Sequence, residues 1–70
     1  MVGRLMDALI ETVHDLAPFE VEEAVIRVPF SEFWPSMTDD DWQKLVFLAM
    51  ATGRIKRGKR PHHLVAVPSL

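Results

Sequence analysis

The sequence predicts a small α+β domain, and three observations support this. An amphipathic helix with clear start and stop signals lies between Thr38 and Gly53. A strongly basic segment with the composition of a β-hairpin follows it directly. The 70 residues are 49% apolar and contain no cysteine, which suits one packed core without disulfides or a thiolate metal site. We therefore expect residues 1–70 to form one domain in the order helix, strand, helix, helix, β-hairpin.

The helix from Thr38 to Gly53 has the most complete local signals. Thr38 suits an N-cap, and Asp41 follows at the spacing of a capping box. Asp39, Asp40 and Asp41 fall in the first turn, where the helix dipole favours carboxylates. Gly53 tolerates the left-handed conformation that ends many helices. The residues expected in the core are Trp42, Leu45, Val46 and Ala49. Those expected to face outward are Asp40, Gln43, Lys44, Phe47 and Ala51.

Five of the eight basic residues occupy seven consecutive positions after this helix. They are Arg54, Lys56, Arg57, Lys59 and Arg60. Gly58 is a turn residue between an expected strand at Arg54–Arg57 and a second strand at His63–Val67. Residues 1–53 carry three basic and ten acidic side chains, a balance of −7. Residues 54–70 carry five basic and no acidic side chains, a balance of +5, so the positive charge gathers in the hairpin.

A first helix is expected to end before Pro18, because proline pushes the preceding residue out of helical space. Its apolar face is expected to contain Val2, Leu5, Met6, Leu9, Val13 and Leu16. The β-branched segment Ala24–Val28 is expected to be an edge strand that ends at Pro29.

A brief helix is expected at Glu32–Trp34, with Ser31 as its cap and Pro35 limiting its length. Trp34 and Trp42 are expected in the core, since a small domain depends on large aromatic side chains for burial. Residues 68–70 are expected to form a frayed tail.

From Ala24 to Val67 this order of elements resembles the winged helix-turn-helix superfamily. The segments that carry the resemblance are Ile26–Trp34, Thr38–Ala51 and Thr52–Ile55, followed by the basic hairpin. Many members of the superfamily bind DNA, and others bind only proteins. The resemblance implies that the domain is a small winged helix-turn-helix domain with the hairpin as its wing.

As a wing, the hairpin would set its five cations against phosphates, with no acidic residue among residues 54–70. Gln43 and Lys44 complete the expected nucleic-acid-binding set, because both face outward and could touch bases. The expected function is that of a small DNA-binding protein, such as a transcriptional regulator, that contacts the nucleic-acid backbone. Two alternatives remain for the same cations: a solvated turn that protects a sheet edge, and a nuclear-localisation-like run.

The acidic first turn of the third helix favours a different function. Helices of this kind usually enter the DNA groove with their N-terminal residues, and the aspartates there would repel phosphates. Asp39, Asp40, Phe47 and Met50 would then form a contact surface for a protein partner or for a second copy of the chain in a homodimer. The alternatives are that the aspartates only stabilise the helix, and that Phe47 and Met50 are buried.

Catalysis is not expected, because the sequence has no glycine-rich phosphate loop, nucleophile elbow or metal-ligand spacing. Neither a cofactor nor a metal site is expected, since neighbouring His62 and His63 would point to opposite faces of a strand. No apolar run approaches the roughly 20 residues of a membrane span. Asp7 and Glu11 suit a helix better than a secretory signal. We expect a cytoplasmic protein that binds nucleic acid or a protein and no membrane.

Overall fold

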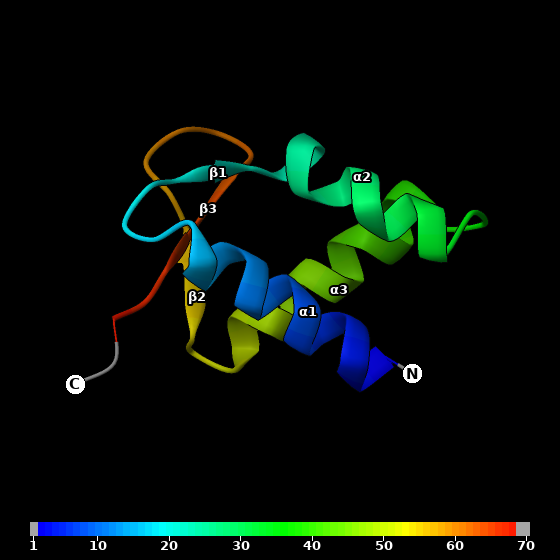
Figure 1. The fold of residues 1–70 in the computed structure, drawn as a ribbon, viewed down its shortest axis with the longest axis horizontal. Helices are drawn as coiled ribbons and strands as arrows, with labels where there is room; N and C mark the ends of the chain where they lie inside the picture. Colours follow the sequence, from blue (N-terminus) through cyan, green and yellow to red (C-terminus); the bar gives the residue numbers. More distant parts are fainter. Residues whose placement is uncertain (1, 69–70) are drawn as a thin grey trace.

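The computed structural model describes residues 2–68, and for Val2 only the backbone. This part of the chain forms three α-helices and a three-stranded antiparallel sheet, so the predicted α+β class is confirmed. The elements are α1 (Val2–Asp15), β1 (Val21–Glu22), α2 (Glu23–Phe33), α3 (Asp39–Ala51), β2 (Ile55–Arg57) and β3 (His63–Ala66). Figure 1 shows the sheet at one end of the molecule and the three helices extending away from it. Residues 69 and 70 of the predicted tail lie outside the described residues.

The core lies between α1, α3 and the inner face of the sheet. Its members from α3 are Trp42, Leu45, Val46 and Ala49, as predicted. α1 contributes Leu9, Ile10 and Val13, each at most 1% exposed. Ile10 was absent from the predicted face of α1, whereas Leu16 was included but is 46% exposed beyond the end of the helix. Trp42 is buried, and Trp34 is half-buried against the core.

The prediction of an edge strand at Ala24–Val28 was wrong, because this segment is helical and belongs to α2. The brief helix expected at Glu32–Trp34 is in fact the end of the same helix. Ile26 and Phe30 are both buried in the core, and this burial outweighs the weak helix propensity of β-branched residues. Pro29 lies inside α2 on its exposed side, so water can bond the carbonyl that proline leaves without a donor.

The first strand is β1, which lies upstream of the predicted one. Val21 pairs with Leu64, and Glu22 pairs with His63. β3 also pairs with β2, so the strand order is β1-β3-β2 and β3 is the central strand. This pairing brings the acidic segment Glu20–Glu23 alongside the basic hairpin, beside the loop at the upper left of Figure 1.

α3 begins and ends where the sequence predicts. Thr38 Oγ1 accepts a hydrogen bond from the Asp41 N–H at 3.1 Å, and Asp41 Oδ2 accepts one from the Thr38 N–H at 3.0 Å. This is the predicted capping box. Gly53 has a φ of 79°, the left-handed conformation expected after the helix. The hairpin strands lie within one residue of their predicted bounds.

Candidate functional site

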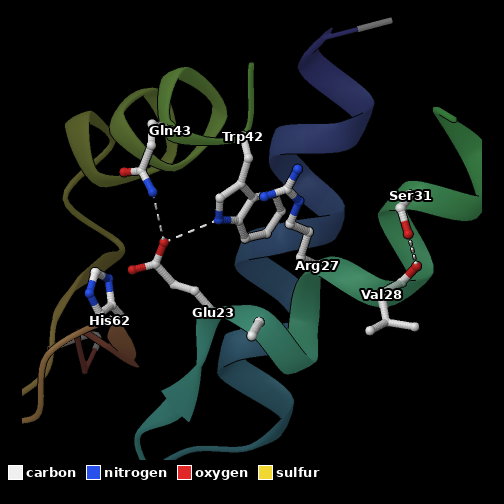
Figure 2. A pocket seen from close by; sticks show the side chains of 8 residues that line it. Glu23, Arg27, Val28, Ser31, Trp42, Gln43 and His62 are labelled. Carbon is white, nitrogen blue, oxygen red and sulfur yellow. Dashed lines mark hydrogen bonds between the residues drawn. The ribbon is translucent and has the colours of Figure 1, made fainter. Parts of the chain in front are cut away.

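A buried carboxylate connects α2, α3 and the hairpin. Glu23 is only 4% exposed, and its Oε1 accepts hydrogen bonds from Trp42 Nε1 at 3.1 Å and Gln43 Nε2 at 3.4 Å, as Figure 2 shows. Its Oε2 lies 3.4 Å from Arg57 Nη1 on β2. The N–H of Glu23 donates to the carbonyl of His62 in the hairpin loop at 2.8 Å. These contacts fix how the hairpin lies against the two helices.

Glu23 borders an open pocket of about 350 Å³ between α2, α3 and the hairpin loop. Arg27 and His62 lie around it in Figure 2. Arg27 Nη1 reaches across to Asp39 Oδ1 at 2.6 Å and so joins α2 to the start of α3. Ser31 Oγ donates to the Val28 carbonyl at 2.7 Å. The polar groups of Glu23, Arg27 and Ser31 are therefore engaged in contacts within the fold.

Two members of the predicted nucleic-acid-binding set meet at this carboxylate. Gln43 on α3 and Arg57 on β2 both contact Glu23, although they are far apart in the sequence. The Arg57 side chain remains 53% exposed. Lys44 lies elsewhere, with its Nζ 3.8 Å from Asp40 Oδ2 on the same exposed face of α3. The structure thus brings Gln43 to the hairpin and leaves Lys44 in an α3 ion pair.

The other four hairpin cations are exposed and form no salt bridge within residues 2–68. They are Arg54, Lys56, Lys59 and Arg60. The Arg54 carbonyl anchors the base of the hairpin, since it accepts from the Val67 N–H at 2.8 Å and lies 2.8 Å from His14 Nε2 on α1. Acidic residues are absent from this segment of the sequence but not from its surroundings in the fold, because Glu20 and Glu23 both contact the hairpin.

The loop after β2 holds the Glu20 carboxylate. Glu20 Oε1 accepts a hydrogen bond from the Arg60 N–H at 3.1 Å. Hydrogen bonds from the backbone of Arg60 and then Lys59, helped by the charges of His63 and Arg60, hold the pKa of Glu20 below its ordinary value. Gly58 leaves room for this contact, since a Cβ there would collide with the Glu20 carboxylate. Neither Glu20 nor Glu23 was predicted as a site residue.

The exposed face of α3 contains the residues predicted to point outward. Phe47 is 69% exposed, and its neighbour Leu48 is 45% exposed. With Asp40, Gln43 and Lys44 they line a shallow hollow of about 470 Å³. Met50, the second apolar residue of the predicted protein-binding surface, is half-buried and packs against the core. The large exposed apolar side chains of α3 are therefore Phe47 and Leu48.

The histidines and carboxylates of residues 2–68 form no group of three or more that could hold a metal ion. None of the helices in this part of the chain has the length and apolar character needed to cross a membrane. The chain matches no protein-family model, and no curated protein or solved structure matches it significantly.

Proposed function

We propose that this protein is a small winged helix-turn-helix protein that binds DNA, as a transcriptional regulator would, with the β2–β3 hairpin as its wing. The order α1-β1-α2-α3-β2-β3 supports the proposal, because it places two successive helices before a hairpin. The strand order β1-β3-β2 supports it too, since the strand between α1 and α2 joins the sheet of the hairpin. The main observation is the group of exposed cations on this hairpin, Arg54, Lys56, Lys59 and Arg60.

The hairpin, rather than α3, makes the principal contact in this proposal. Asp39 and Asp40 at the exposed start of α3 repel phosphates, and Phe47 places an aromatic ring where a groove-binding helix needs polar groups. Gln43 already donates its amide to Glu23. Contacts to phosphates position a protein on DNA without reading the bases. The binding is therefore salt-sensitive and only weakly sequence-specific.

The test is a fluorescence-anisotropy titration on two unrelated duplexes at several salt concentrations. Arg60→Ala reduces the slope of log affinity against log salt by about 0.9 on both duplexes, the value expected for one lost phosphate contact. Arg4→Ala is the matched control, because it removes the same exposed charge from the start of α1, away from the hairpin. Gln43→Ala changes the preference between the duplexes only if α3 reads bases. Absence of wild-type binding at low salt would overturn the proposal.

A second candidate function is protein binding through α3, possible without any DNA contact. The observation that favours it is the exposed pair Phe47 and Leu48 beside Asp40. In this case wild-type protein retains a partner from nuclease-treated lysate, and Phe47→Ala loses it. Phe33→Ala is the control, because Phe33 is 84% exposed at the end of α2 and outside the hollow. Equal retention by both variants would exclude the α3 surface.

A further inference from the structure

The loop between β2 and β3 already binds an oxyanion, which belongs to the chain itself. The Glu20 carboxylate accepts a hydrogen bond from the Arg60 N–H at 3.1 Å, and the neighbouring backbone of Lys59 also helps to lower its pKa. Successive backbone N–H groups in a turn form a concavity that suits anions. Gly58 keeps this concavity open, since a side chain there would occupy the position of the carboxylate.

A phosphate group matches this concavity at least as well as a carboxylate. Both spread one negative charge over two oxygens that accept hydrogen bonds from backbone N–H groups, when the phosphate belongs to a nucleic-acid backbone. The side chains of Lys59 and Arg60 are both exposed, so they are free to approach a phosphate bound at the Arg60 N–H. Glu20 comes from outside the hairpin, directly before β1, and can leave the loop without breaking a strand pair.

We propose that the loop Gly58–Arg60 is a phosphate-binding site that Glu20 occupies in the free protein and that a backbone phosphate of nucleic acid takes over on binding. The choice of nucleic acid as the source of the phosphate rests on the function proposed above. Glu20 then acts as an internal competitor. Its position next to β1 keeps it close to the loop after displacement, so it lowers the affinity of the wild-type protein for nucleic acid.

Glu20→Ala tests the competition, with Glu22→Ala as its matched control. Both variants remove one carboxylate from the same short segment, but Glu22 is exposed and its carboxylate makes no hydrogen bond or salt bridge within residues 2–68. In the anisotropy titration Glu20→Ala is expected to bind the duplex about tenfold more tightly than Glu22→Ala. A factor of this size corresponds to roughly one hydrogen bond to a charged group, here the bond of the Glu20 carboxylate that the phosphate must otherwise displace. Equal affinities in the two variants, with wild-type binding intact, overturn this inference and leave the proposed function standing.

Gly58→Ala, introduced into the Glu20→Ala variant, tests whether the concavity itself holds the phosphate. Gly58 does not have a positive φ, and the collision with Glu20 no longer exists in this background, so the loop keeps its conformation. The added methyl group fills the space of the carboxylate and cancels the gain in affinity. A gain that survives Gly58→Ala contradicts binding inside the loop.

A titration with inorganic phosphate, followed by NMR, separates this inference from the proposed function. Saturable shifts of the Lys59 and Arg60 amide signals are expected in Glu20→Ala and much weaker ones in Glu22→Ala. Absence of such shifts overturns the loop as an anion site. Shifts with phosphate but no duplex binding by any variant overturn both the role of nucleic acid and the proposed function.

Discussion

At the scale of single residues, two carboxylates fix the position of the hairpin. Glu23 is buried and bonds to α3 and β2, whereas Glu20 bonds to the backbone of the loop. Burial of a carboxylate requires partners for its oxygens, and Glu23 has Trp42, Gln43 and Arg57. Trp42 in turn needs an acceptor for its indole N–H, because it is only 2% exposed.

Glu23→Ala is expected to lower the free energy of unfolding by about 1–3 kcal/mol, because it leaves the buried Trp42 N–H without a partner. Arg57 contributes less to this loss, since its half-exposed side chain can turn to water. Urea denaturation measures the effect. Glu22→Ala, at an exposed position, should change stability by less than about 0.5 kcal/mol. Equal effects of the two substitutions would mean that Glu23 does not join the elements.

Acid is expected to weaken the fold through Glu20 and Asp41. The backbone N–H of Thr38 is the main cause of the lowered pKa of Asp41, and the backbone of Arg60 plays that part for Glu20. A carboxylate with a lowered pKa stabilises the fold above its unfolded-state pKa, and the stabilisation is lost as the pH falls through the folded-state pKa. The melting temperature should therefore fall on acidification below about pH 4. It should fall less steeply in Glu20→Gln than in Glu22→Gln, and identical profiles would exclude the Glu20 contribution.

At the scale of elements, α3 and α2 are helical for different reasons. The cap, the apolar spacing and the terminal glycine of α3 all lie within one short stretch of sequence. Local signals of this kind are sufficient to predict a helix and its bounds. α2 lacks a side-chain cap, contains Pro29 and is rich in β-branched residues. It is helical because Ile26 and Phe30 are buried by other elements.

Thr38→Ala is expected to lower stability by about 0.5–2 kcal/mol, because it removes the side-chain half of the capping box. Thr38→Ser keeps the hydroxyl group and should retain most of that stability. The two variants are compared by urea denaturation. If Thr38→Ala proves as stable as the serine variant, the cap does not contribute to α3.

The candidate site could be predicted only in part, for a related reason. The hairpin cations form a run that is visible in the sequence, and they are exposed in the fold. The carboxylates that contact the hairpin come from positions 34 and 40 residues away in the chain. Contacts between residues so far apart in the chain leave no pattern in the local sequence. β1 could not be predicted either, because a strand of two residues is too short to show an alternation of apolar and polar side chains.

At the scale of the whole molecule, one small core holds every element. Leu45→Ala is expected to cost about 2–5 kcal/mol, because the side chain is only 3% exposed and belongs to the hydrophobic core. In a chain of 70 residues this loss can abolish folding. Circular dichroism with urea denaturation measures it, and Leu48→Ala, at a partly exposed position on the same helix, is the control. A smaller loss for Leu45→Ala than for Leu48→Ala would contradict the assigned core face of α3.

The charges are also organised at this scale. The first 53 residues are acidic and the last 17 basic, but the fold places Glu20, Glu22 and Glu23 against the basic hairpin. The cationic side chains that are exposed and form no salt bridge within residues 2–68 are those available to a partner, above all Lys56, Lys59 and Arg60. The central claim is that these residues contact the phosphates of nucleic acid.

The most direct measurement is the set of backbone amide shifts in an ¹⁵N-resolved NMR spectrum as a DNA duplex is added at low salt. Binding through the hairpin predicts the largest shifts within residues 54–60, smaller ones along α3, and their reversal when salt is raised. Shifts confined to α3 around Phe47, or no shifts at all, would contradict it.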